Sequence, residues 1–253
     1  MQGKTVLITG GAGGIGMETA KAFLDDGANV ALVDISADAL KNAKDKLNQP
    51  DKILTIEADV TNEAEVKQYV DETVETYGSV DVFFNNAAVA GPATPIKELE
   101  KDTFEQIMGI NTTGVFLGMK HVIQQMEKQG YGAIINAASN AAYIGSANMV
   151  GYIASKHAVA GMTKTAALEE ASHGIRINAV APAAIDTNML TGIQENLSPE
   201  DPNAAAEAIK QAIPVGRFGT PKDVSAVVKF LASDEAAFVT GSLYNVDGGM
   251  QAD

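Results

Sequence analysis

A serine, a tyrosine and a lysine are spaced so that they could move a proton at an oxygen atom. Tyr152 and Lys156 stand four residues apart, and in a helix they would share one face. The ordinary pKa of tyrosine is about 10, and a neighbouring ammonium favours the phenolate, so we expect Lys156 to lower the pKa of Tyr152. Ser139 could orient a carbonyl oxygen by a hydrogen bond. Each feature has a structural alternative, an amphipathic helix for the pair and a turn or helix cap for the serine.

A glycine-rich turn near the N-terminus could hold a phosphate. Residues 9–16 read Thr-Gly-Gly-Ala-Gly-Gly-Ile-Gly, between an apolar run and a helical pattern. Glycines let the backbone approach a pyrophosphate, and the following helix N-terminus offers free N–H groups. No Gly-Lys-Ser/Thr follows, which excludes a P-loop. The turn therefore predicts a dinucleotide site.

The choice between NAD and NADP depends on one acid. Asp34 ends the second apolar run, 18 residues after Gly16. A carboxylate there would accept hydrogen bonds from the ribose hydroxyls and repel a 2′-phosphate. The two arginines, Arg176 and Arg217, are both far from this turn in the sequence, so no guanidinium near it would receive a 2′-phosphate. We expect NAD as the cofactor.

These residues must be positioned by an alternation of short apolar runs and amphipathic segments. Continuous runs rich in Val and Ile are typical of strands buried on both faces. Seven such runs are expected as strands: Thr5–Thr9, Asn29–Asp34, Ile53–Ala58, Val80–Asn85, Ala133–Ala138, Arg176–Ala181 and Ser242–Val246. Helices are expected at about 14–26, 37–48, 63–77, 102–128, 150–172 and 221–233. The alternation predicts an α/β fold, a Rossmann-type doubly wound parallel sheet with helices on both faces.

The pattern indicates one dinucleotide-binding catalytic domain over residues 1–253. One stretch, about 186–219, interrupts the alternation; it contains Pro199, Pro202 and Pro214 and an Ala-rich helical piece from Asn203 to Ile213. A long excursion inside a compact domain is often a substrate lid, which we expect here. The alternative is a plain pair of surface helices.

Composition excludes several classes of function. The formal net charge of −14 argues against a nucleic-acid or anionic membrane surface. The chain has no cysteine, and its three histidines show no ligand-like spacing, so we expect no metal site. The N-terminal apolar run is too short for a signal peptide or a membrane span, which makes a cytoplasmic protein the expectation.

In combination, these motifs resemble the short-chain dehydrogenase/reductase family. The matching residues run through the whole chain: Thr9-Gly10-x-x-x-Gly14-x-Gly16, Asp59-Val60, Asn85-Asn86-Ala87, Asn111, Ser139, Tyr152-x-x-x-Lys156, Asn178-x-Val180-x-Pro182 and Asp247-Gly248-Gly249. Each motif is weak alone, whereas the set, in this order and spacing, is very specific.

The resemblance implies a role for each matched position. The implied catalytic residues are Asn111, which would keep a kinked helix and a proton-relaying water, Ser139, Tyr152 and Lys156. The implied cofactor contacts are Gly10, Gly14, Ile15, Gly16, Asp34, Ile35, Asp59, Val60, Asn86, Tyr152, Lys156, Pro182, Ile185 and Thr187. The expected substrate contacts are Ser139, Met149, Tyr152, Ala183 and Met189.

Two positions depart from the family pattern. Ala88 and Ala183 stand where the family usually has glycine, and each adds a methyl group and disfavours a positive φ. Ala183 therefore puts the shape of the nicotinamide end in question. Residues near the expected pocket are small or apolar, which favours an uncharged secondary alcohol or ketone. The lid residues 197–202 resemble those of family members that act on cyclic ketones.

Small residues along 150–172, together with the helix around 102–128, match the family's subunit interface, and the resemblance implies a homotetramer. Two alternative functions remain open. A 3-oxoacyl-carrier-protein reductase shares nearly every motif, but Asp34 and the negative charge disfavour it. A non-catalytic dinucleotide-sensing protein would not need Ser139, Tyr152 and Lys156 together.

Overall fold

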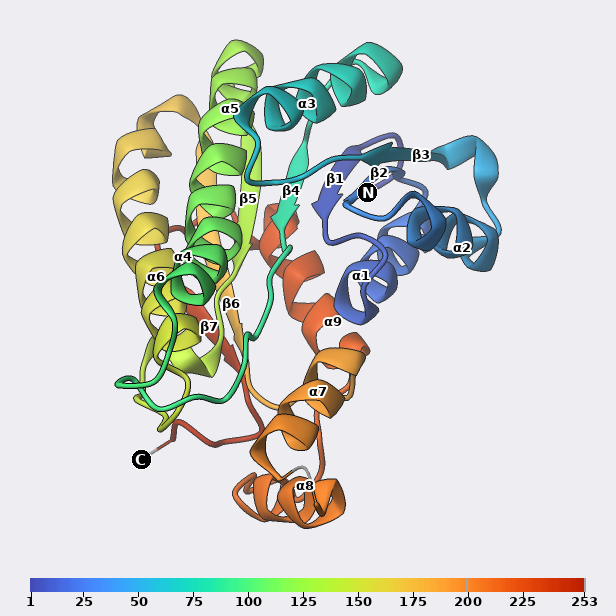
Figure 1. Ribbon diagram of the computed structural model, residues 1–253. Coiled ribbons are helices and arrows are strands. Elements are labelled where there is room, and N and C mark those ends of the chain that lie inside the picture. The colour runs from blue at the N-terminus through green and yellow to red at the C-terminus, as the bar shows by residue number, and fades with distance from the viewer. Residues whose placement is uncertain (199, 253) are drawn as a thin grey trace.

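Seven apolar runs form one parallel sheet in the computed structural model, which describes residues 1–198 and 200–252 (Figure 1). The order across the sheet is β3-β2-β1-β4-β5-β6-β7, and every neighbouring pair is parallel. The strands are β1 (Thr5–Thr9), β2 (Asn29–Asp34), β3 (Ile53–Glu57), β4 (Val82–Asn85), β5 (Gly132–Ala137), β6 (Ile175–Pro182) and β7 (Leu243–Val246). The predicted doubly wound fold is confirmed.

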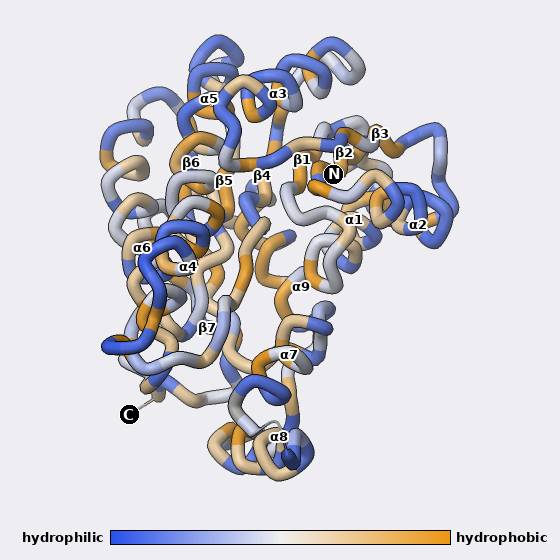
Figure 2. Tube along the Cα trace, viewed as in Figure 1, coloured by the Kyte–Doolittle hydropathy of each residue, from blue (hydrophilic) through white to orange (hydrophobic). Residues whose placement is uncertain are grey.

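The strands are apolar throughout because both faces of the sheet are covered. In β1 every residue is buried, and successive side chains enter opposite cores. Leu7 packs with α3 (Glu63–Tyr77), α5 (Gly114–Gln129) and α6 (Val150–Glu170) on one face. Val6 and Ile8 pack with α1 (Gly14–Asp25), α2 (Ala37–Leu47) and α9 (Pro221–Ala232) on the other. Figure 2 shows the hydrophobic colour concentrated along the central strands and the polar colour on the outer turns of the helices.

The helices lie close to their predicted ranges. They are α1 (Gly14–Asp25), α2 (Ala37–Leu47), α3 (Glu63–Tyr77), α4 (Lys101–Met108), α5 (Gly114–Gln129), α6 (Val150–Glu170), α7 (Asn188–Leu197), α8 (Pro202–Gln211) and α9 (Pro221–Ala232). Short 3-10 turns lie at Pro50–Lys52, Asn140–Ala142, Ala171–His173 and Asp234–Ala236. Among the residues described, none of the helices is both long enough and apolar enough to cross a membrane.

The helix expected over 102–128 is interrupted. A π-helical turn, Gly109–Thr113, separates α4 from α5, and it contains the buried Asn111. Such widened turns often occur where a side chain must be turned toward a functional site.

The excursion after β6 contains two helices. The Ala-rich piece forms α8, and the side chain of Asp201 caps it by accepting a hydrogen bond from the Ala204 N–H. No range was predicted for the helix α7, which was considered only within the alternative of a pair of surface helices. A parallel bridge between Ile185 and Gly219 joins the two ends of the excursion, so α7 and α8 project from the body of the molecule (Figure 1). Pro199 lies outside the described residues.

Candidate active site

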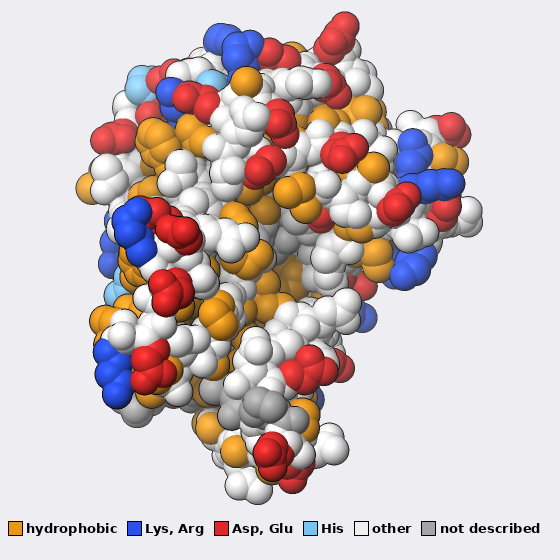
Figure 3. Space-filling model, in the orientation of Figure 1, with side chains coloured by type: hydrophobic (Ala, Val, Ile, Leu, Met, Phe, Trp, Pro, Cys, Tyr) orange, Lys and Arg blue, Asp and Glu red, His pale blue; other side chains and the backbone are white. Residues whose placement is uncertain are grey.

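The carboxyl ends of β1, β4, β5 and β6 meet at one edge of the sheet, beside α7. In parallel α/β sheets, ligands bind outside the carboxyl ends of the strands. Figure 3 shows that the molecular surface is hollowed between α7 and the rest of the body, and that hydrophobic side chains border the hollow. Of the polar side chains predicted from the sequence, Asn86, Ser139 and Thr187 follow these strand ends. Tyr152 and Lys156 come from α6.

The ends of β1 and β4 are tied together by one hydroxyl. The Thr9 Oγ1 atom accepts hydrogen bonds from the N–H groups of Asn86, at 2.9 Å, and Ala87, at 3.2 Å. The Asn86 side chain in turn donates to the carbonyl oxygens of Thr9 and Gly10. Asn86 therefore braces the glycine-rich turn in this structure. Sequence reasoning included Thr9 in a motif but missed this role of its hydroxyl group.

The glycine-rich turn passes the test for a phosphate cradle. Gly10 has φ +62°, in the region that favours glycine, and a Cβ atom at Gly16 would overlap the carbonyl oxygen of Gly10. Gly13 and Gly14 are exposed. Helix α1 starts here without a side-chain cap and without an acidic residue in its first turn. Its first N–H groups and positive dipole end thus face outward, as a bound pyrophosphate requires.

Asp34 lies beside this turn. Its Oδ2 atom accepts a hydrogen bond of 3.2 Å from the N–H of Ala12, which places the carboxylate against the turn at the end of β2. Ile35 follows with 68% of its surface exposed, although it is a large apolar residue. An acid and an exposed apolar side chain at this place match the ribose hydroxyls and the flat base of a dinucleotide without a 2′-phosphate.

Asp59 and Val60 follow the carboxyl end of β3, at the same end of the sheet as the other predicted cofactor contacts. The Asp59 carboxylate accepts hydrogen bonds from the N–H and the hydroxyl group of Thr61, both at 2.8 Å, so it stabilises its own turn. Val60 packs against Gly114 at the start of α5, where a Cβ atom would come within 2.8 Å of its Cγ2 atom. Both residues are half-buried.

Ser139 is buried after the end of β5. Its Oγ atom donates toward the Asn140 Oδ1 atom, at 3.1 Å, or the carbonyl oxygen of Pro182, at 3.3 Å. It also accepts a hydrogen bond from the N–H of Ala141 and so caps the short helical turn that follows. The expected cap and the expected site residue are therefore the same serine.

Tyr152 and Lys156 meet on one face of α6, as their spacing predicts. The Lys156 Nζ atom lies 5.6 Å from the centre of the Tyr152 ring and donates a 2.8 Å hydrogen bond to the carbonyl oxygen of Ala137. The lysine is 2% exposed. These contacts bring Tyr152 and Lys156 to the end of β5, where Ser139 follows.

The expected lowering of the tyrosine pKa is wrong for this structure. Burial raises the pKa of Tyr152, and a hydrogen bond with the Ser139 side chain only partly opposes that effect. Burial also lowers the pKa of Lys156 to about 8. The sequence argument counted the charge of the ammonium but not the loss of water around both groups, and here desolvation is the larger cause.

Asn111 holds the π-helical turn against the loop after β4. Its Oδ1 atom accepts from the N–H of Val89, and its Nδ2 atom donates to the Val89 carbonyl oxygen, both at 2.8 Å. Nδ2 also donates to the Ser155 Oγ atom at 3.1 Å. Asn111 is fully buried, so these bonds fix α4, α5 and α6 relative to one another. Ser155, which sequence reasoning missed, stands directly before Lys156.

The residues after β6 lie next to the glycine-rich turn. A Cβ atom at Gly14 would be 3.0 Å from the Cγ2 atom of Thr187, so the two predicted phosphate contacts are neighbours. Pro182 and Ile185 are buried, and the Thr187 hydroxyl donates to the Ile185 carbonyl oxygen. Ile15 is half-buried at the start of α1.

The two alanines that replace glycine are not strained. Among the described residues only Asn48 and Asn148 are non-glycine residues with positive φ, so Ala88 and Ala183 have ordinary backbone conformations. Of the other predicted substrate contacts, Met189 in α7 is 38% exposed and Met149 is half-buried before α6.

A cavity of about 330 Å³ lies between Ala183, the end of the excursion at Ile213 and Val215, and residues 245–248. Arg217 lines it, but the guanidinium is already engaged. Its two terminal nitrogens lie 2.8 and 3.3 Å from the carboxylate oxygens of Asp223, and one of them also donates to the Phe218 carbonyl oxygen. The cavity therefore offers little unsatisfied positive charge to an anionic substrate.

Comparison with known proteins gives a match over nearly the whole chain. Residues 10–251 match the family described as enoyl-(acyl carrier protein) reductase. Levodione reductase of Leifsonia aquatica is 42% identical, over 98% of this chain and 94% of its own length. A 3-oxoacyl-(acyl-carrier-protein) reductase of Thermotoga maritima is 39% identical, over 99% and 98% of the two chains. Cyclohexanol dehydrogenase of an Acinetobacter species is 38% identical, over 97% and 94%.

Solved structures give the same result. The crystal structure of levodione reductase superposes with a TM-score of 0.97 at 41% identity, covering 100% of this chain and 99% of that one. A xylitol dehydrogenase solved with bound NAD+ gives a TM-score of 0.95 at 34% identity, covering 98% and 99%.

Proposed function

The chain belongs to the short-chain dehydrogenase/reductase family, and from this premise we propose that it transfers a hydride between NAD(H) and an uncharged secondary alcohol or ketone. The observation that carries the proposal is the meeting of Ser139, Tyr152 and Lys156 beside the carboxyl end of β5. A protein that only senses a dinucleotide has no use for a half-buried phenol next to a buried ammonium.

The cofactor follows from the turn and from Asp34. The open N-terminus of α1, the glycines at 10 and 16 and the carboxylate at the end of β2 fit NAD, and a 2′-phosphate would lie against the Asp34 charge. When bound, NAD(H) supplies or accepts the hydride. Thr187, next to Gly14, would complete the contacts to the phosphates.

The proton is handled by the chain. Because burial raises the pKa of Tyr152, its phenol is neutral at physiological pH and can donate its proton to a substrate carbonyl oxygen. Lys156, held by the Ala137 carbonyl oxygen, places a positive charge near the phenolate that this donation leaves. The Ser139 hydroxyl would turn from its present acceptors to the substrate oxygen. Asn111 keeps the helix that carries Tyr152 in place.

The substrate is proposed to be uncharged and cyclic. The cavity at Ala183 is lined in part by the apolar side chains of Ile213 and Val215, and the one guanidinium in its lining, that of Arg217, is paired with Asp223. Levodione reductase and cyclohexanol dehydrogenase, two relatives named above, carry names of enzymes for cyclic compounds. We take the excursion 186–219 to be the lid of this pocket within a single catalytic domain.

A second candidate is a 3-oxoacyl-carrier-protein reductase, favoured by the 39% identity to the Thermotoga maritima enzyme. An acidic carrier protein needs a basic docking surface. The net charge of −14 and the acid at position 34 disfavour this candidate.

Assembly and location are part of the proposal. Phe116 on α5 and Leu168 on α6 are 49% and 85% exposed, and Gly161 and Ala158 leave space for close helix packing. These features support a homotetramer built on α5 and α6. A cytoplasmic location fits an enzyme that draws on the NAD of the cell interior.

The test is turnover with a matched set of substrates. Purified protein with NAD+ or NADP+ is mixed with cyclohexanol, open-chain secondary alcohols and a 3-hydroxyacyl thioester, and reduced cofactor is followed by its absorbance. We expect turnover with NAD+ and the cyclic alcohol. Preferred turnover of the thioester with NADP+ would establish the second candidate instead. Dinucleotide binding without turnover of any substrate would contradict both.

A further inference from the structure

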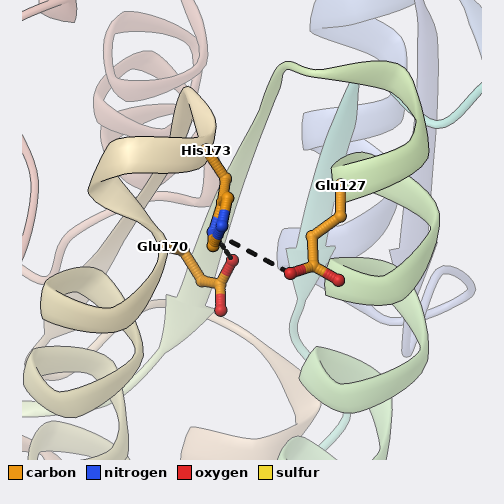
Figure 4. Close-up of side chains that lie close together, drawn as sticks. All are labelled: Glu127, Glu170 and His173. Carbon is orange, nitrogen blue, oxygen red and sulfur yellow. Dashed lines mark hydrogen bonds and ion pairs between the residues drawn. The ribbon is translucent and has the colours of Figure 1, made fainter.

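Three side chains that the proposed reaction does not use converge at the far ends of two long helices. Glu127 lies in the last turn of α5, Glu170 is the last residue of α6, and His173 follows one turn later (Figure 4). The His173 Nδ1 atom lies 3.0 Å from Glu170 Oε2 and 3.8 Å from Glu127 Oε1. One oxygen from each carboxylate and one imidazole nitrogen all lie within 4.8 Å of one another.

The charge at this cluster is not balanced by the chain. In the part of the chain that the structure describes, neither Glu127 nor Glu170 has a lysine or arginine nitrogen within 4.0 Å, and His173 is their shared partner. Glu170 is only 9% exposed. His173 can supply at most one positive charge to the two carboxylates, so one negative charge is left for solvent or a cation to compensate.

The backbone adds more negative potential. α5 and α6 both end here, so the partial negative charge of two helix C-termini is added to the two carboxylates. The helix ends are also rigidly placed. Gly130 and Gly174, which follow them, both have positive φ, and a Cβ atom at Gly174 would be 2.7 Å from the Gly130 carbonyl oxygen. The cluster is therefore a fixed, electron-rich site open to solvent.

The ligand types and distances match a first-row divalent cation. Glu170-Ala171-Ser172-His173 has the Glu-x-x-His spacing that, with a glutamate from a neighbouring helix, holds metals in helical bundles. In a tetrahedral zinc site with bonds of about 2.1 Å, neighbouring ligand atoms are about 3.4 Å apart. The two separations from the histidine nitrogen, 3.0 and 3.8 Å, bracket that value, and the two carboxylate oxygens lie within 4.8 Å of each other, so side-chain rotations suffice to form the site.

We propose that Glu127, Glu170 and His173 bind one Zn²⁺ ion, with solvent completing its coordination. The bound cation would neutralise the carboxylates and join the ends of α5 and α6. Zn²⁺ suits this set because it accepts both imidazole and carboxylate ligands and tolerates four-coordination.

The site is structural and stands apart from the proposed reaction. Fourteen residues of α6 separate Lys156 from Glu170, which corresponds to about 21 Å along a helix. The cluster lies where β5 and β6 begin, whereas the candidate active site lies where they end. Zn²⁺ here would stabilise the fold and leave the chemistry unchanged.

The experiment measures metal binding by the untagged full-length protein after treatment with a chelator. Titration calorimetry with ZnCl₂, checked by equilibrium dialysis and metal analysis, should give one Zn²⁺ per chain. His173→Gln and Glu127→Gln should each weaken binding at least tenfold, because each removes one of three ligands. His157→Gln and Glu169→Gln, an exposed histidine and an exposed glutamate on the same helix, are the matched controls and should bind like wild type.

A second readout separates binding from folding. Zn²⁺ should raise the thermal unfolding midpoint of the wild type and of the controls, but not that of the two ligand variants, whose metal-free circular dichroism should match wild type. Absence of stoichiometric binding at 1 mM Zn²⁺ would overturn the proposal and leave the cluster as a histidine ion pair. A Zn²⁺ affinity of His173→Gln equal to that of wild type would also overturn the proposal. Neither result depends on turnover.

Discussion

The side-chain ammonium of Lys156 donates a 2.8 Å hydrogen bond to the carbonyl oxygen of Ala137, so a buried lysine is fixed by the strand whose end precedes Ser139. This bond satisfies one of the three ammonium protons, and burial lowers the pKa of the lysine to about 8. The unfolded chain has no such environment, and there the lysine keeps its ordinary value of 10.5.

The first prediction concerns the pH dependence of stability. Below pH 8 Lys156 is protonated in both states, and the folded protein is destabilised by the buried charge. Between pH 8 and 10.5 the folded protein has lost this proton while the unfolded chain still binds it, so the free energy of unfolding rises with pH. The full shift corresponds to about 3 kcal/mol. Urea titrations at one protein concentration should show that Lys156→Met removes this rise.

The comparison isolates the lysine. The raised pKa of Tyr69, caused by burial, works in the opposite direction above pH 10, but Tyr69 is present in both proteins. Lys164→Met changes an exposed lysine of the same helix and should retain the wild-type pH dependence. A parallel pH profile of wild type and Lys156→Met would contradict the buried-charge argument.

The second prediction concerns the proton donor. Tyr152→Phe removes the phenol but keeps the ring, so kcat should fall by about 10²- to 10⁴-fold while the Kd for NADH stays within a few-fold of wild type. Steady-state kinetics and fluorescence titration measure the two quantities. Tyr131→Phe, a tyrosine at the opposite end of the sheet, should leave both unchanged. Retained turnover in Tyr152→Phe would refute the assignment.

The third prediction separates the charge of Asp34 from its hydrogen bond. Asp34→Asn keeps an oxygen that can accept from the Ala12 N–H, but removes the charge that would repel a 2′-phosphate. The ratio of NADPH to NADH affinity should therefore rise at least tenfold, with little loss of stability. Asp34→Ala should also lower the free energy of unfolding, because the hydrogen bond from the Ala12 N–H is lost. Asp38→Asn, an exposed acid of α2, serves as control. An unchanged affinity ratio in Asp34→Asn would show that the charge does not select the cofactor.

The fourth prediction concerns the π-helical turn. Asn111→Ala removes, from a fully buried position, the acceptor of the Val89 N–H and the donor to the Val89 carbonyl oxygen and the Ser155 hydroxyl. We expect a loss of about 2 kcal/mol or more in the free energy of unfolding, together with a lower kcat, since α6 carries Tyr152. Asn203→Ala, at an exposed position of α8, should change stability by less than about 0.5 kcal/mol. Wild-type stability in Asn111→Ala would mean that the turn does not depend on this side chain.

The fifth prediction concerns assembly. If α5 and α6 form the subunit interface, Leu168→Glu places a charge in it and should dissociate the tetramer, whose mass is four times the 26.3 kDa of one chain. Light scattering after size exclusion measures this directly. Phe238→Glu changes another exposed apolar residue, outside these helices, and should keep the α5–α6 contact. A Leu168→Glu protein that remains tetrameric would place the interface elsewhere.

The sequence was sufficient to predict the sheet, because strands that are buried on both faces consist of continuous apolar runs. It was also sufficient for the position of Tyr152 and Lys156, since helical spacing alone puts residues four apart on one face. Hydrophobic periodicity did not give the bounds of helix α7 or the break at Asn111, and the kink at Asn111 was expected only from the family resemblance. α7 projects from the body of the molecule together with α8, and a π-helical turn has no distinct hydrophobic period of its own.

The surroundings of individual side chains were the second feature that the sequence could not predict. The spacing of two residues shows which charges are neighbours, but not how much water surrounds them. The loss of water decided the direction of the pKa shift of Tyr152. The same holds for Glu127, Glu170 and His173. Glu127 is 46 residues away from His173 in the chain, so the cluster forms only when the ends of α5 and α6 come together.

The strand order has a consequence for how the chain is made. Starting from β1, each later strand joins an edge that is already free: β2 and β3 extend one side, and β4 to β7 extend the other. No strand has to be inserted between two that have paired. The sheet can therefore grow outward while the polypeptide leaves the ribosome. Its last strand, Leu243–Val246, pairs only after it emerges, so a chain that stops before residue 243 leaves β6 exposed for pairing with other chains.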